Sequence, residues 1–131
     1  MSFAFALLLA HAGAATAVQN CIANAVTQQD MNACAAQDFR AADDALNAQW
    51  AITAADMRQR DVDTAEYRDD RPSYFDQLLE AQRAWLAYRD AHCDSEGYAA
   101  RGGSMEPMLV ALCRTTLTRE RTQQLLDLTQ P

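Results

Sequence analysis

The chain has 131 residues, which is enough for one ordinary domain and too few for two. Eleven basic residues, all of them arginine, stand against eighteen acidic residues and give a formal net charge of −7. This balance disfavours a nucleic-acid-binding protein, because binding to phosphates needs clustered cationic side chains. Four glycines and three prolines are too few for the many turns of an all-β domain. The composition therefore predicts a small helical protein.

The start of the chain predicts export. Residues 3–10 form an apolar run that is too short to span a bilayer, which takes about 20 apolar residues. Small residues follow and end in an A-x-A pattern before Val18, as is typical of a signal-peptide cleavage site. We therefore expect a signal peptide at residues 1–17 and a mature domain at residues 18–131, periplasmic or secreted and not attached to a membrane. A buried N-terminal helix is the alternative, because the chain start carries no positive charge.

Four cysteines, Cys21, Cys34, Cys93 and Cys113, follow the predicted cleavage site, and none of them forms a CxxC pair. Their spacing disfavours a zinc ribbon, a zinc finger or a thioredoxin-type motif, and their even number after a signal peptide favours two disulfides. Four cysteines can form two disulfides in three different patterns, and we expect the pattern that joins neighbours in the sequence. Cys21 and Cys34 flank an expected helix start, and Cys93 and Cys113 flank a glycine-containing loop. Each bond should stabilise the fold by about 3 kcal/mol.

The first expected helix runs from about Gln28 to about Arg58. Thr27 can cap it, with Asp30 three residues later as in a capping box. Apolar residues then recur at spacings of mostly three and four, the period of one helical face. They are Met31, Cys34, Ala35, Phe39, Ala42, Leu46, Trp50, Ala54 and Met57.

Two further helices are expected after a charged connector at residues 60–70. Pro72 suits the first turn of the second helix, which should end near Cys93, before a loop at residues 94–103. The inward residues of this helix are predicted to be Phe75, Leu78, Leu79, Trp85, Leu86 and Cys93.

Ser104 is expected to cap the third helix, with Pro107 in its first turn. Its predicted apolar face comprises Met108, Leu109, Leu112, Cys113, Leu117, Leu125 and Leu128. The fold class is therefore all-α, a small three-helix assembly linked by two disulfides.

Polar residues also fall beside the tryptophans of two helices. Gln82 and Arg89 flank Trp85, while Asp43 and Asn47 precede Trp50 at helical spacing. If these faces meet, a buried Arg89 needs a carboxylate, because an unpaired buried charge is strongly unfavourable. We expect Asp43 to pair with Arg89, and Gln82 and Asn47 to complete the hydrogen bonds. The alternative is that these residues line a binding cleft.

Enzyme chemistry is not indicated. His92 is the one histidine after the predicted cleavage site, and its neighbour Cys93 is assigned to a disulfide. The sequence has no GxSxG elbow, and the acids between residues 61 and 70 lack the D-x-D-x-D-G pattern of a calcium loop, so we interpret them as a solvated surface. We predict no catalytic residues, no cofactor and no metal site.

The chain resembles the LprI-like lysozyme-inhibitor family of small exported bacterial helical proteins. The resemblance covers essentially the whole mature chain, in four ordered blocks that include all four cysteines. They are Cys21 with T-Q-x-x-M-N-x-C from Thr27, A-D-x-x-L-N-x-x-W from Ala42, L-x-A-Q-R-A-W-x-x-Y-R-D-x-x-C from Leu79, and Gly103-Ser104 leading to C-x-x-x-L-T-x-x-R-x-x-x-L from Cys113. Trp50 stands where the family more often has tyrosine. The lipid-attachment cysteine of the founding member is absent.

The resemblance implies a helical domain and a lysozyme as partner, and the four matching blocks look like scaffold. The alternative function is a non-catalytic envelope module that binds another protein or a small ligand. Binding residues sit disproportionately on loops, so we expect a contact surface at residues 60–71 or 94–103. Tyr98 and Arg101 are the first candidates for partner binding.

Overall fold

The computed structural model describes residue 17 and residues 19–130, and within these it contains helices and no strand. A short helical segment at residues 19–23 precedes the main bundle. The main elements are helix α2 (Gln28–Asp63), the 3-10 helix η1 (Ala65–Tyr67), α3 (Tyr74–Gly97), η2 (Tyr98–Ala100) and α4 (Glu106–Asp127). The predicted all-α fold with three long helices is confirmed. The predicted signal peptide lies, apart from its last residue, outside the described residues.

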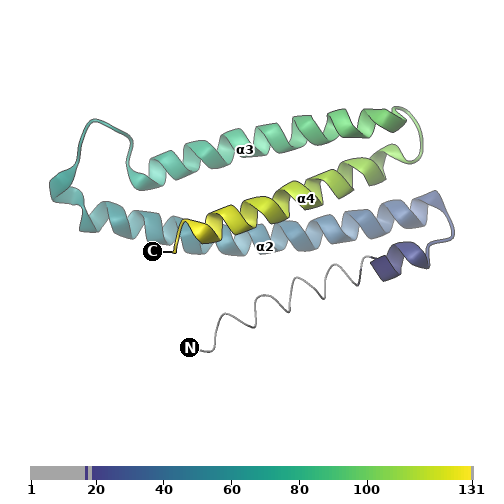
Figure 1. The fold of residues 1–131 in the computed structure, drawn as a ribbon, viewed down its shortest axis with the longest axis horizontal. Helices are drawn as coiled ribbons and strands as arrows, with labels where there is room; N and C mark the ends of the chain where they lie inside the picture. Colours follow the sequence, from purple (N-terminus) through teal and green to yellow (C-terminus); the bar gives the residue numbers. More distant parts are fainter. Residues whose placement is uncertain (1–16, 18, 131) are drawn as a thin grey trace.

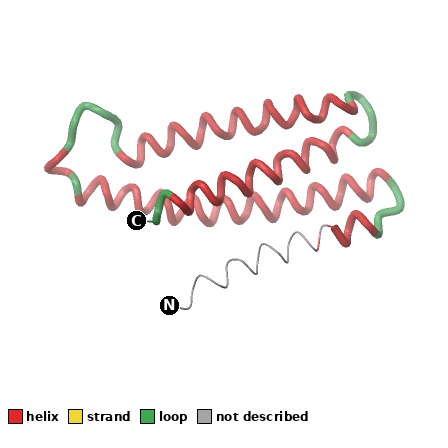
Figure 2. Tube along the Cα trace, in the orientation of Figure 1, coloured by secondary structure: helices red, strands yellow, loops and turns green. Residues whose placement is uncertain are grey.

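The three long helices form an up-down-up bundle (Figure 1). α3 returns antiparallel to α2, and α4 turns back to run in the same direction as α2. Figure 2 shows that two stretches without long helix join them, one between α2 and α3 and one between α3 and α4. We call the end with the α2–α3 linker the connection end. The opposite end, which holds both disulfides, is called the disulfide end.

The start of α2 follows the prediction, and its end does not. Thr27 accepts a hydrogen bond from the Asp30 backbone, and the Asp30 carboxylate accepts one from the Thr27 N–H, which completes a capping box. α2 then continues to Asp63, five residues past the predicted end at Arg58. Side-chain pairs one turn apart support this last stretch, with Arg60 2.8 Å from Asp56 and Gln59 donating to Asp63. The prediction missed this stretch because these side chains are polar and show no apolar periodicity.

Both ends of α3 differ from the prediction. Ser73 is the N-cap and accepts from the Asp76 backbone, so Pro72 lies just outside the helix and not in its first turn. The helix passes Cys93 and reaches Gly97, and η2 follows directly, so residues 94–100 of the predicted loop are helical. Gly97 allows a close approach to α4, because an added Cβ would lie only 2.4 Å from Val110 Cγ2. Leu86, predicted to face inward, is exposed.

The start of α4 is also partly different. Pro107 lies in the first turn as predicted, but Ser104 is not the cap, because Met105 occupies that position without a side-chain hydrogen bond. The Ser104 carbonyl instead accepts from Asn32 Nδ2 of α2 at 2.9 Å. The Glu106 carboxylate accepts from the Gly102 N–H at 2.7 Å, and Gly102 adopts a positive φ of 77°. The turn is therefore held by a carboxylate that sequence analysis did not single out.

Large apolar side chains gather toward the connection end. Leu46, Met57, Leu78 and Leu125 form the buried cluster, and Trp50, Phe75 and Trp85 pack against it. The disulfide end has instead the two predicted bonds, Cys21–Cys34 and Cys93–Cys113, and both pairings are confirmed. In α2 the predicted inward residues are all buried or half-buried.

Candidate functional site

A layer of polar side chains lies between the three helices. Its members are all less than a tenth exposed and come from each helix: Asp38, Gln49, Thr53, Gln82, Arg89, Thr115, Thr118 and Arg121. Buried polar groups are costly unless they find partners. The partners they find decide whether this layer is a binding site or part of the scaffold.

Arg89 is buried and has partners on all three helices. Its Nη1 lies 3.5 Å from Asp43 Oδ1 and 3.3 Å from Thr118 Oγ1, and its Nε donates to Asp90 Oδ1 at 3.0 Å. The expected contact with Asp43 is present but is the longest of the three. The guanidinium also lies 5.1 Å from the ring of Trp85, within the range of a cation–π contact.

The two expected amides behave differently from each other. Asn47 donates to the Asp43 carboxylate at 3.5 Å, as expected for a residue that supports the pair. Gln82 is not among the hydrogen-bond partners of Arg89, so that part of the prediction is wrong. Its Oε1 accepts instead from Arg121 Nε of α4 at 2.9 Å.

Arg121 is the most unusual member of the buried layer. It donates to the amide oxygens of Gln82 and Gln124, and among the described residues no carboxylate lies within 4.0 Å of it. Its Nη2 atom is buried without a hydrogen-bond partner. Burial lowers the pKa of this guanidinium below its ordinary value, because desolvation disfavours the charged form.

A further ion pair joins α2 to α4. Asp38, buried, lies 2.6 Å from Arg119 Nη2, and sequence analysis did not identify either residue. Some of these contacts run between helices, such as Arg89 with Thr118, and others lie within one helix, such as Arg89 with Asp90. The contacts between helices favour the interpretation of the buried layer as a scaffold that fixes helix register.

The disulfide end exposes the two residues predicted to bind a partner. Tyr98 lies in η2 and is 53% exposed, and Arg101, also exposed, follows η2 directly. The Arg101 guanidinium lies 4.6 Å from the Tyr98 ring centre, so the two side chains form one cation–π unit. The Cys93–Cys113 bond links α3 to α4 close to this turn.

The connection end carries an open hollow of about 750 Å³ between the end of α2 and the start of α3. The Asp61 carboxylate accepts from the backbone N–H groups of Tyr74 and Phe75 at 2.8 and 3.1 Å. Asp69 pairs with Arg71, which lowers the pKa of Asp69. Asp61 and Asp69 therefore stabilise the start of α3 and the linker before it. Both were interpreted from the sequence as part of a solvated acidic surface, and these contacts were not predicted.

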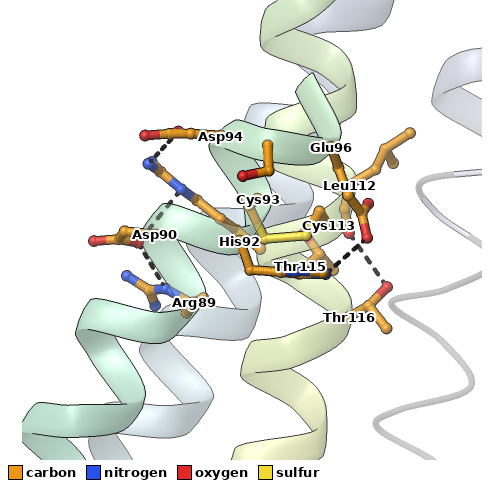
Figure 3. The surroundings of a disulfide bond; sticks show 12 residues. Arg89, Asp90, His92, Cys93, Asp94, Glu96, Leu112, Cys113, Thr115 and Thr116 are labelled. Carbon is orange, nitrogen blue, oxygen red and sulfur yellow. Dashed lines mark hydrogen bonds and ion pairs between the residues drawn. A yellow bond between two sulfur atoms is a disulfide. The ribbon is translucent and has the colours of Figure 1, made fainter. Parts of the chain in front are cut away.

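A cluster beside the α3–α4 disulfide was also missed. His92 Nε2 lies 3.1 Å from Glu96 Oε1, and both point toward Cys113 (Figure 3). Every cysteine in the described chain is in a disulfide, so Cys113 offers no thiol nucleophile beside the histidine. The pair at helical spacing was visible in the sequence, but its approach to Cys113 depends on how α4 packs.

The fold, the two disulfides and the buried polar layer together define a small disulfide-linked helical scaffold. The chain belongs to the LprI lysozyme-inhibitor family, because the family model described as "Lysozyme inhibitor LprI" matches residues 21–125. The chain is also 46% identical over 104 residues to the uncharacterized protein R02472 of Rhizobium meliloti (strain 1021). That alignment covers 79% of this chain and 75% of the relative. No solved structure matches the chain significantly.

The family description is that of an inhibitor, which fits a binding role better than catalysis. Two disulfides fit an oxidising compartment outside the cytoplasm. In the part of the chain that the structure describes, no helix is both long and apolar enough to cross a membrane.

Proposed function

We propose that this protein is exported, loses residues 1–17, and binds and inhibits a lysozyme in the periplasm or outside the cell. The observation that carries the proposal is the match to the lysozyme-inhibitor family over residues 21–125. Inhibition by a small rigid domain needs a surface that blocks the enzyme, and it needs no catalytic residue of its own.

Charge supports the same partner. The chain has a formal net charge of −7, which complements a cationic lysozyme and should raise the rate of association. Attraction of this kind is screened by salt. Inhibition should therefore weaken as ionic strength rises, mainly through slower binding.

Tyr98 and Arg101 form the proposed contact. Tyrosine and arginine are enriched among the residues that contribute most to protein interfaces. The two side chains already contact each other, and the nearby Cys93–Cys113 bond limits the motion of the turn that carries them. A preorganised contact loses less conformational entropy on binding.

The other end of the bundle offers a matched comparison. Tyr67, 82% exposed, and Arg68, also exposed, are the same residue types and lie on the α2–α3 linker, outside both disulfides. A double change there removes as much aromatic and cationic surface without touching the disulfide end. It is the appropriate control for a double change of Tyr98 and Arg101.

The test is titration of purified, oxidised residues 18–131 into a lysozyme assay on cell walls. We expect inhibition at micromolar concentration or below, and we expect Tyr98→Ala with Arg101→Ala to weaken it by at least about 30-fold, as for loss of a residue worth 2 kcal/mol. Tyr67→Ala with Arg68→Ala should change it less than about threefold. Thermal unfolding of each variant confirms that the fold is intact.

Each outcome is decisive for one part of the proposal. No inhibition at micromolar concentration, at low and at moderate salt, overturns the function. Inhibition that is lost only in the Tyr67 and Arg68 variant moves the contact to the connection end. If lysozyme is not bound and a pull-down from periplasmic extract repeatedly returns one other protein, the protein is the non-catalytic binding module of the alternative interpretation.

A further inference from the structure

The neighbourhood of the α3–α4 disulfide, Cys93–Cys113, has the composition of a metal site. One ligand atom each from His92, Glu96 and Cys113 lies within 4.8 Å of the other two. His92 and Glu96 are one helical turn apart on α3, and Figure 3 shows both beside the disulfide. This is the one such group that the described residues contain.

In the oxidised protein this group is incomplete. A disulfide sulfur carries no negative charge, and it is the thiolate that binds metal ions. Oxidised, the cluster offers an imidazole and a carboxylate. Reduced, it offers the thiolate of Cys113, which belongs to the group, and the thiolate of Cys93, to which Cys113 is bonded in the oxidised protein.

We propose that the two thiolates released from the α3–α4 disulfide bind a zinc ion together with His92 and Glu96. Zinc takes four ligands of these three kinds in tetrahedral geometry. The ion would join α3 to α4 where the disulfide joins them in the oxidised protein. The reduced chain thereby keeps a cross-link at the disulfide end.

The reaction balances with a dithiol as reductant. The dithiol gives up two electrons and two protons and closes to its own disulfide, while Cys93 and Cys113 become two thiols. Zinc then replaces the two thiol protons, which pass to the solvent. No other oxidant or reductant takes part.

The geometry has one pair of ligand atoms near the spacing that zinc needs, and the two sulfurs must move to complete the site. With bond lengths of about 2.0–2.1 Å, nitrogen and oxygen ligands of a tetrahedral zinc lie about 3.4 Å apart, close to the 3.1 Å between His92 Nε2 and Glu96 Oε1. With zinc–sulfur bonds of about 2.3 Å, the two sulfurs must separate to about 3.8 Å. Side-chain rotation can provide this, because the Cα atoms of Cys93 and Cys113 are 5.4 Å apart.

The surroundings also suit a cation. His92 is held by stacking on Tyr88, with ring centres 5.3 Å apart. The nearby positive charge of Arg114 is balanced by Asp90 and Asp94, at 3.5 and 3.4 Å. His92 and Glu96 are both partly exposed, which gives the ion access from solvent.

The other disulfide provides an internal control. Reduction of Cys21–Cys34 also releases two thiols, but the described residues place no histidine and acid around them in such a group. A chain with Cys21→Ser and Cys34→Ser retains the proposed site. A chain with Cys93→Ser and Cys113→Ser retains only the control pair.

Each of these chains, as full mature protein, would be reduced with a phosphine, freed of reductant without air, and titrated with cobalt(II) and zinc(II). We expect the first chain to bind one ion, with the spectrum of tetrahedral cobalt and thiolate-to-cobalt charge transfer, and to bind zinc at least about tenfold more tightly than the second. In the first chain, His92→Ala or Glu96→Ala should weaken zinc binding by more than about tenfold, since even partners outside the ligand shell contribute 10- to 100-fold. Glu80→Ala, which removes an exposed carboxylate of α3 outside the cluster, should leave it unchanged.

The contrary results are equally clear. Equal affinity in the two chains, or no effect of either His92→Ala or Glu96→Ala, overturns the proposal. If the reduced chain unfolds, circular dichroism measures its helix content before and after zinc is added. Recovery of helix on addition of zinc then supports the site, and no recovery overturns it. None of these outcomes depends on lysozyme.

Discussion

The two ends of the bundle are stabilised by different interactions. At the connection end, leucine, methionine, tryptophan and phenylalanine side chains from all three helices form the apolar cluster. At the disulfide end the buried apolar side chains are alanines and cysteines, and larger ones such as Met31 and Val110 are only half-buried. Small side chains bury little apolar area, and hydrophobic stabilisation is proportional to that area. The cross-links therefore lie where the apolar core contributes least.

The two ends also differ in how firmly their exposed residues are held. The disulfide end presents Tyr98 and Arg101 on a turn between two linked helices. The connection end presents Tyr67 on a linker that is fixed mainly by hydrogen bonds to Asp61 and Asp69. A binding surface benefits more from the first arrangement, because its side chains are held in place before the partner arrives.

The largest expected effect is loss of the apolar cluster. Leu125→Ala should lower the free energy of unfolding by about 2–5 kcal/mol, because this fully buried side chain leaves a cavity between the helices. Leu128→Ala, on an exposed leucine one turn later, should cost no more than about 0.5 kcal/mol. Urea unfolding measures both. Equal effects would mean that the connection end does not depend on its apolar cluster.

Removal of the α3–α4 disulfide should come next. Cys93→Ser with Cys113→Ser should lower the free energy of unfolding by about 3 kcal/mol, because the bond closes a loop of 20 residues in the unfolded chain. Native-state hydrogen exchange should show the greatest loss of protection around η2 and the start of α4. Greater loss at the connection end would contradict the comparison of the two ends.

A smaller effect is expected where Asp61 caps the start of α3. Asp61→Ala removes the acceptor for the N–H groups of Tyr74 and Phe75 and should cost about 1 kcal/mol. Asp63→Ala, which removes an exposed carboxylate bonded to Gln59, serves as the control. Amide exchange should quicken in the first turn of α3 for the first variant only.

The smallest expected effect is on the loss of stability in acidic solution. Hydrogen bonds from Thr27 lower the pKa of Asp30 in the folded protein, so its contribution to stability is present above the pKa of the unfolded chain and is lost as pH falls through the folded-state value. Asp30→Asn should therefore reduce the stability difference between neutral and acidic solution. Asp44→Asn, an exposed carboxylate of α2 outside the capping box, is the reference in the same acid titration.

Local signals in the sequence predicted the fold well. Thr27 and Asp30 mark the start of α2, Pro107 marks the start of α4, and the cysteine spacing predicts both disulfides. The end of α3 was mispredicted because Gly97 was included in the predicted glycine-containing loop, whereas it lies in the helix and permits close packing against α4. A glycine needed for packing and a glycine at a helix end look alike in one sequence.

The polar layer was harder to predict than the apolar stripes. Arg89 was identified because it follows Trp85 at helical spacing. Arg121 was not, although it follows Leu117 and precedes Leu125 at the same spacing, so the signal was present in the sequence. The partners of Arg121 depend on how α4 packs against α3, which brings Gln82 to it. Which polar groups meet is therefore a tertiary property.

The pairing of the disulfides has a consequence for biosynthesis. Both bonds join cysteines that are neighbours in chain order, Cys21 with Cys34 and Cys93 with Cys113. When a chain emerges N-terminus first into an oxidising compartment, the first available partner of each cysteine is thus its native partner. Oxidation in order of emergence would therefore form the native bonds directly, with no wrong bond to rearrange.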